Sequence, residues 1–251
     1  MWTRLLITLS LSLILAYSAL AAVQIYYPVS GSAGGGSSVY IGQVSPGSTV
    51  TIITDRGPQS DPWSKVITTP ASWAGGYFVQ GNRLYIEVNV PRNASGAKTV
   101  CFQLLGNSSS ESFCAALLVT TGLMDFNVPE KTVYVGAGNT VSVPFIVINR
   151  GAGSYSVRVL SSLPAQFFRG TTIKMNPFSA RTGEVAIRYP FPGEYRVILT
   201  ARNLGDGEQR SSEIALFVYP TIDNDFKLVQ WGFPFSNPFL WPLMTILGAA
   251  R

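Results

Sequence analysis

The stretch from Thr99 to Val119 constrains the fold more than any other part of the chain. It reads T-V-C-F-Q-L-L-G-N-S-S-S-E-S-F-C-A-A-L-L-V and contains the only two cysteines, Cys101 and Cys114. Two apolar runs flank a tip of Gly, Asn and Ser, which predicts a β-hairpin. When the hairpin closes about Asn107 and Ser108, Cys101 lies opposite Cys114.

This register predicts a disulfide. Opposed residues of antiparallel strands have Cα atoms roughly 4.5–5.5 Å apart, a separation that a disulfide tolerates. A bridge that closes so short a loop contributes about 3 kcal/mol in the chain-entropy model. The same register places Phe102 opposite Phe113 on an apolar face, so the two cysteines lie on the other face. The alternative is a pair of reduced cysteines that face each other; an oxidising compartment favours the bridge.

The first 22 residues indicate such a compartment because they have the pattern of a secretory signal peptide. An apolar run from Leu5 to Leu15 follows Arg4, and Ala19-Leu20-Ala21 fits the small-x-small cleavage pattern. The mature chain is then expected to begin near Ala22 or Val23. An uncleaved N-terminal anchor is the alternative, since the apolar stretch is just long enough to span a bilayer. In both cases we expect an extracytoplasmic protein, either secreted or associated with the membrane at the cell surface.

If the chain is exported, two sequons in it become candidates for N-glycosylation. Asn93-Ala94-Ser95 and Asn107-Ser108-Ser109 both fall in predicted loops, and the second is the tip of the hairpin. Glycosylation needs exposed loops of this kind. Asn93 and Asn107 are therefore candidate glycosylation sites.

The composition argues against most catalytic chemistry. The sequence has no histidine, which removes Ser-His-Asp and Cys-His mechanisms and His-ligated zinc. The only close carboxylate pairs, Asp206 with Glu208 and Asp223 with Asp225, are interpreted as turn residues. We predict no catalytic residue, metal site or cofactor.

The net charge of +5 is spread along the chain, whereas nucleic-acid binding needs a clustered basic face, so no nucleic-acid partner is expected.

From Val23 onward the chain reads as short strands separated by Gly, Pro, Ser and Asn, with no long helical period. The two halves also resemble each other, since Pro46 to Ile52 parallels Ala137 to Val143, and Val88 to Leu104 parallels Ile187 to Leu199. Regularly spaced strands with turn signals indicate β-sandwiches. We therefore predict an all-β protein with two tandem β-sandwich domains, residues 23–120 and 121–220.

Two loops stand out in the first predicted domain. Gly31 to Ser38 is expected to be a flexible loop or linker. Arg56 to Gly76 is expected to be a long loop that carries Trp63 and Trp73. Exposed tryptophans there would suit contacts with a sugar or a protein, whereas the alternative is that they plug one end of the sandwich.

The second half carries a recognisable motif. Gly138 to Gly151 reads G-N-T-V-S-V-P-F-I-V-I-N-R-G, Leu163-Pro164 follows, and Pro192 to Ala201 reads P-G-E-Y-R-V-I-L-T-A. With this motif the second half resembles the immunoglobulin-like modules of exported archaeal and bacterial proteins of the NEW3/CARDB type. The resemblance covers Asp125 to Pro220 and implies that the two tandem sandwiches are immunoglobulin-like. Modules of this type serve as spacers, adhesive units or accessory domains beside enzymes. It implies no catalytic residue, and it suggests Tyr195 as a tyrosine corner. The first half departs from the pattern because it lacks a matching tyrosine.

Residues 221–251 form an apolar, aromatic tail. From Trp231 to Ala250 the tail carries no charge. Three interpretations remain: a membrane anchor, an interfacial or partner-docking segment, or a cap that packs on the sandwich. Pro242 would restrict a helix to Leu243–Ala250, which is too short to span a bilayer. The candidate membrane- or partner-docking residues are Trp231, Phe233, Phe235, Phe239, Leu240 and Trp241.

Together these features predict a non-enzymatic structural or interaction protein of the cell envelope, held to the membrane or to a membrane complex by its tail. One alternative is a carbohydrate-binding accessory module in which Trp63 and Trp73 contact cell-surface glycans. The other is a self-assembling surface subunit, as in a pilus or S-layer, in which a strand completes a neighbour's sheet.

Overall fold

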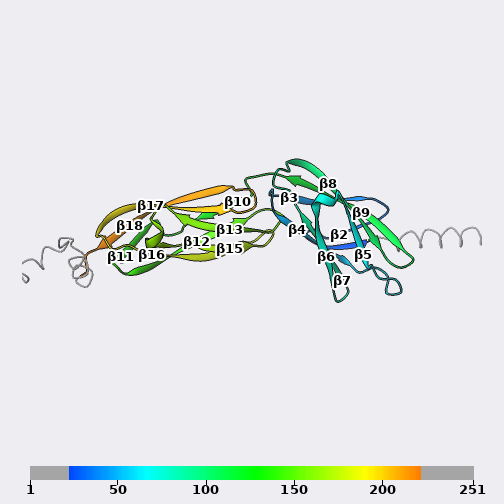
Figure 1. The fold of residues 1–251 in the computed structure, drawn as a ribbon, viewed down its shortest axis with the longest axis horizontal. Coiled ribbons are helices and arrows are strands. Elements are labelled where there is room, and N and C mark those ends of the chain that lie inside the picture. The colour runs from blue at the N-terminus through cyan, green and yellow to red at the C-terminus, as the bar shows by residue number, and fades with distance from the viewer. Residues whose placement is uncertain (1–22, 222–251) are drawn as a thin grey trace, which may run out of the picture. The chain divides into compact units, whose positions relative to one another are not determined.

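The computed structural model describes residues 23–221, which form an almost entirely β structure (Figure 1). The described residues hold strands and two short 3₁₀ turns but no α-helix, and they divide into two compact units. The first unit comprises residues 23–123 with the segments Arg150–Tyr155 and Asn176–Phe178, and the second comprises the other described residues. The predicted domains were continuous along the chain, so the grouping of these two segments with the first unit differs from the prediction.

The first unit contains two sheets. Sheet A has the spatial order β2 (Gly31–Ala33), β1 (Val23–Tyr27), β4 (Thr49–Asp55), β7 (Arg83–Asn89) and β6 (Ala74–Gln80). Sheet B has the order β3 (Ser38–Val44), β9 (Ser110–Val119), β8 (Gly96–Leu105) and β5 (Lys65–Thr69). The paired strands are antiparallel except for β3, which runs parallel to β9.

Alternation along these strands builds the core of the first unit. In β4 every second side chain is buried, and β7, β8 and β9 follow the same period. Successive side chains of a strand point to opposite faces, so each sheet presents one apolar face. Burial of apolar surface is the main driving force that holds two such faces together. The buried side chains include Val50, Ile52, Leu84 and Ile86 from sheet A and Val100, Phe102, Leu104 and Phe113 from sheet B.

The second unit repeats this architecture. Sheet C has the order β10 (Met124–Asn127), β12 (Thr140–Asn149), β16 (Ala180–Arg188) and β14 (Phe168–Arg169). Sheet D has the order β11 (Thr132–Gly136), β18 (Gln209–Tyr219), β17 (Gly193–Asn203), β13 (Tyr155–Ser161) and β15 (Thr171–Met175). Here β11 runs parallel to β18, as β3 does to β9.

The internal repeat in the sequence corresponds to a shared strand register. Val50 of β4 pairs with Val88 of β7, and Val141 of β12 pairs with Ile187 of β16. In both units the last two strands form a long antiparallel hairpin beside a short parallel strand. This is the layout of an immunoglobulin-like sandwich, and the predicted all-β, tandem immunoglobulin-like fold is confirmed.

Two predicted loops are wrong in part. Strand β5 and the 3₁₀ turn η1 (Ala71–Trp73) lie inside the predicted loop Arg56 to Gly76, and β2 lies inside the predicted linker Gly31 to Ser38. Both strands are at sheet edges, where few side chains are buried. Backbone pairing can form such strands without the apolar alternation that would reveal them in a sequence.

Among residues 23–221 no helix is long and apolar enough to cross a membrane. The predicted signal segment, residues 1–22, lies outside the described residues. So does the tail beyond Thr221, including the docking candidates from Trp231 to Trp241.

Candidate interaction surfaces

The predicted hairpin is formed by β8 and β9. Cys101 pairs with Cys114 and Phe102 with Phe113, in the predicted register. The cysteines form a disulfide, and their Cα atoms are 4.0 Å apart. Phe102 and Phe113 are buried with ring centroids 5.0 Å apart, while the cysteines are half-buried on the opposite face. The disulfide and the orientation of the hairpin are both confirmed.

A carboxylate from a distant loop holds the tip of this hairpin. Asp61 Oδ1 accepts the Asn107 N–H at 2.6 Å, and Oδ2 accepts the Ser108 N–H at 2.9 Å. Oδ2 also accepts the hydroxyls of Ser108 at 2.9 Å and Ser109 at 2.7 Å. The hydroxyl of Ser109, followed by the donors of Ser108 and Asn107, holds the pKa of Asp61 well below its usual range. Gly106 permits this approach, since a Cβ there would lie 2.7 Å from Asp61 Oδ1.

The two sequon asparagines are exposed. Asn93 lies in the turn between β7 and β8, and Asn107 lies at the tip of the β8–β9 hairpin. At that tip the two serine hydroxyls of the sequon are bound to Asp61. Glycosylation of either asparagine stays a prediction.

The two tryptophans are buried in the core of the first unit. Trp63 is 4% exposed and Trp73 is 6% exposed. The indole of Trp63 lies against Gly57, where an added Cβ would be 2.5 Å from the ring, and its backbone N–H donates to Arg56 O at 2.8 Å. The interpretation of these residues as a ligand-contact platform needed exposed ring faces and is wrong. Their burial favours the alternative, in which they plug one end of the sandwich.

The close carboxylate pair of the second unit organises a turn. Asp206 Oδ1 accepts the Glu208 N–H at 2.8 Å, and Glu208 lies 2.9 Å from Arg210 in an ion pair. Burial raises the pKa of Asp206. No cluster of three or more His, Cys, Asp or Glu side chains among the described residues is placed to hold a metal ion. The other pair, Asp223 and Asp225, lies outside the described residues.

The second unit has an exposed group of aromatic rings that the sequence did not reveal. Tyr134 of β11 is stacked with Phe217 and Tyr219 of β18, at centroid distances of 5.2 and 6.0 Å. Tyr134 is 58% exposed and Tyr219 is 54% exposed. We call these three residues the aromatic strip. Tyrosines combine an apolar ring with a polar hydroxyl, which suits a surface that binds a partner.

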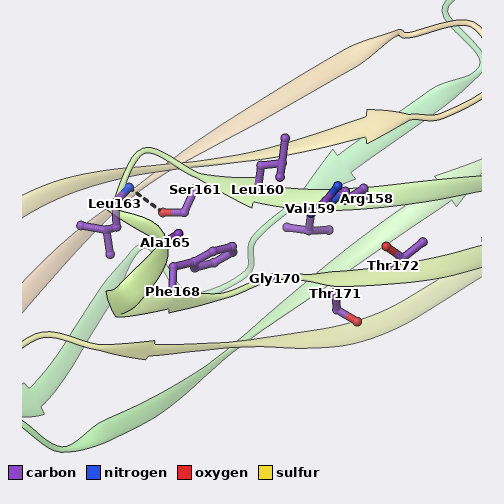
Figure 2. Close-up of a pocket in the computed structure, with 10 residues that line it drawn as sticks. All are labelled: Arg158, Val159, Leu160, Ser161, Leu163, Ala165, Phe168, Gly170, Thr171 and Thr172. Carbon is purple, nitrogen blue, oxygen red and sulfur yellow. Dashed lines mark hydrogen bonds between the residues drawn. The ribbon is translucent and has the colours of Figure 1, made fainter.

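A pocket of about 320 Å³ lies beside β13 (Figure 2). It is lined by residues of β13, of the η2 turn (Ala165–Phe167) and of the chain through β14 to β15. Arg158 is its one charged residue, and the Ser161 hydroxyl already accepts the Leu163 N–H at 3.1 Å. Its ten lining residues include no carboxylate.

No protein family and no curated protein matches the sequence of this chain, so the resemblance to NEW3/CARDB modules stays a prediction. Solved structures are similar in fold. A chimeric titin Z1Z2 has a TM-score of 0.40 at 14% identity and covers 79% of this chain and 97% of its own. The CbhA fibronectin(III)-like modules of Clostridium thermocellum have a TM-score of 0.29 at 15% identity, with 79% and 94% covered. The D00-D0 domain of intimin has a TM-score of 0.30 at 12% identity, with 77% and 98% covered. At these values the likeness concerns the fold alone.

Proposed function

We propose that this protein is a non-enzymatic, extracytoplasmic structural or interaction protein of the cell envelope. In this proposal its immunoglobulin-like modules, of the NEW3/CARDB type, are held at the membrane or on a membrane complex by the C-terminal tail. The signal-like segment and the uncharged stretch Trp231–Ala250 motivate the location. The observation that carries the proposal is the position of the aromatic strip at the end of the described chain.

The described part of the second unit ends next to the aromatic strip. Tyr219 is the last residue of β18, and two residues later the Thr221 hydroxyl donates to Ala137 O at 2.9 Å. Residues 222–251 therefore continue from the end of the sheet that carries the exposed rings of Tyr134 and Tyr219. Tyr and Trp side chains are favoured where one surface meets both apolar and polar surroundings, as at a membrane–water interface or a partner's surface. The exposed rings of the strip offer such a surface, and the sequence of the tail has the same aromatic character.

Deletion of Trp231–Arg251 tests the role of the tail. We expect most of the protein to move from the membrane fraction to the soluble fraction. A chain of full length with Ser at the six docking candidates should behave in the same way, because the proposal rests on apolar character rather than length. Mass spectrometry of the mature N-terminus must show cleavage near Val23, so that an uncleaved anchor does not mask the result. Unchanged membrane recovery of both variants would show that the tail has no such role.

The carbohydrate-binding alternative loses its two candidate residues because Trp63 and Trp73 are buried. The self-assembly alternative is favoured by one observation, since no strand among residues 23–221 pairs with the outer edge of β6 in sheet A.

A further inference from the structure

Most sheet edges of the described chain are protected against pairing with another chain. Strands β2, β10 and β14 have only three, four and two residues. Lys65 begins β5, Lys174 lies in β15 and Lys131 directly precedes β11. Strand β3 is irregular between Tyr40 and Gly42. Short strands, lysines and bulges are the means by which proteins keep sheet edges from associating.

Strand β6 has none of this protection over most of its length. Its seven residues, A-G-G-Y-F-V-Q, include no charge and no proline. Its register shift is confined to Ala74 and Gly76, which leaves Tyr77–Gln80 in regular pairing with β7. Three consecutive apolar side chains of this part are exposed, Tyr77 by 43%, Phe78 by 48% and Val79 by 39%. An open, regular and apolar edge of this kind is a template for another strand.

The ring of Phe78 shows where the next strand would lie. It is stacked on Tyr85 of β7 with centroids 4.7 Å apart and an angle of 8° between the planes. This distance equals the spacing of neighbouring strands, about 4.7–4.9 Å. Because β6 is the last strand of sheet A, no described strand covers the opposite face of the Phe78 ring. A ring from one further strand would extend the stack at the same spacing.

We propose that β6 pairs in antiparallel orientation with β6 of a second copy of this chain, across a two-fold axis at Phe78. In this arrangement Phe78 lies opposite Phe78 of the second copy, and Tyr77 lies opposite Val79. The two stacks join into one row of four rings, Tyr85 and Phe78 from each copy. An isologous contact of this type closes on itself and gives a dimer.

The distribution of charge favours a second copy as the occupant. Across a two-fold axis a strand meets its own sequence, so a charged residue near the axis would face a like charge, which destabilises strand pairing. Residues Ala74–Gln80 carry no charge. Arg83 of β7, which pairs with Gln80, lies over the ring of Tyr26 of β1 at 5.0 Å, on the side of β7 away from β6.

The test is sedimentation of the mature full-length chain over a range of concentrations. We expect a monomer–dimer equilibrium that Phe78→Lys weakens at least about tenfold, because the variant places two cations at the axis and removes an aromatic pair. Tyr40→Lys is the matched control, since Tyr40 is 58% exposed on β3, an edge of sheet B, and it should leave dimerisation unchanged.

A second variant keeps the test decisive if Phe78→Lys fails to fold. Both native cysteines are bridged, so the thiol of Phe78→Cys would be the only free one. Opposed residues of antiparallel strands are close enough for a disulfide, so mild oxidation should link two copies, whereas Tyr40→Cys should not. A protein that is monomeric at every concentration, or a dimer that neither Phe78 variant affects, would overturn the proposal. Loss of the dimer on deletion of Trp231–Arg251 would also overturn it, since association would then belong to the tail.

Discussion

The two units share a fold but secure their final hairpins in different ways. In the first unit the β8–β9 hairpin is bridged between Cys101 and Cys114, and Asp61 holds its tip. At the corresponding pair of the second unit, Arg196 lies opposite Ala215. The tip of that β17–β18 hairpin is closed from within. Asn203 Oδ1 accepts the Gly205 N–H at 2.9 Å, and Asp206 and Glu208 complete the turn.

The second unit has a further contact at the start of β17. The Tyr195 hydroxyl donates to Pro192 O at 3.2 Å, and its ring lies 4.5 Å from that of Tyr189. This is the predicted tyrosine corner, a side chain that ties the start of a late strand to the preceding loop. The alternating core therefore specifies the sandwich in both units, while the contacts that secure each hairpin differ. A change to one of these contacts should affect one unit only.

Removal of the disulfide is expected to give the largest difference in stability loss between the two units. Replacement of Cys101 and Cys114 by Ala should lower the stability of the first unit by about 3 kcal/mol, because the unfolded chain regains the freedom of the closed loop. Amides of the second unit should keep their protection. Hydrogen exchange resolved by peptide would measure both units at once, with Arg196→Ala as the control at the corresponding exposed position. Equal loss of protection in both units would contradict their independence.

Substitution of Asp61 should destabilise the first unit less than removal of the disulfide, and its effect should depend on pH. Its folded-state pKa is depressed, so its contribution is complete above the unfolded value of about 3.9 and is lost as the pH falls below it. Asp61→Asn should therefore destabilise the first unit at neutral pH, and its difference from the native chain should shrink in acid. Denaturant unfolding at a series of pH values measures this difference.

Asp206→Asn is the matched comparison in the second unit. Burial raises the pKa of Asp206, so the folded state disfavours the ionised form of this side chain. The stability of this variant relative to the native chain should rise as the pH rises through the pKa of Asp206, opposite to the trend for Asp61→Asn. The same trend for both variants would show that one of the two environments is misassigned.

The local sequence could predict the hairpin and the repeat, but not which aromatic side chains are buried and which are exposed at the surface. The register of Cys101 with Cys114 follows from apolar alternation on both sides of one tip, which is short-range information. The burial of Trp63 depends on the path of its loop around Gly57, and the stack of Tyr134 with Phe217 depends on parallel pairing of strands far apart in sequence. The sequence does not reveal strand β6, because Tyr77, Phe78 and Val79 are three consecutive apolar residues, all exposed, and lack the in–out pattern of a half-buried strand.

The smallest expected effect belongs to the tyrosine corner. Tyr195→Phe keeps the ring against Tyr189 and removes only the hydroxyl that donates to Pro192 O. One hydrogen bond contributes about 1 kcal/mol, so the second unit should lose stability by that amount while the first unit is unchanged. Tyr134→Phe is the control, since Tyr134 is 58% exposed and removal of a solvent-exposed hydroxyl should cost little stability. Hydrogen exchange of the β17 amides would measure the difference. If Tyr195→Phe costs no more than Tyr134→Phe, the corner does not secure the second unit, and its stability then rests on the alternating core and the local turn at Asp206.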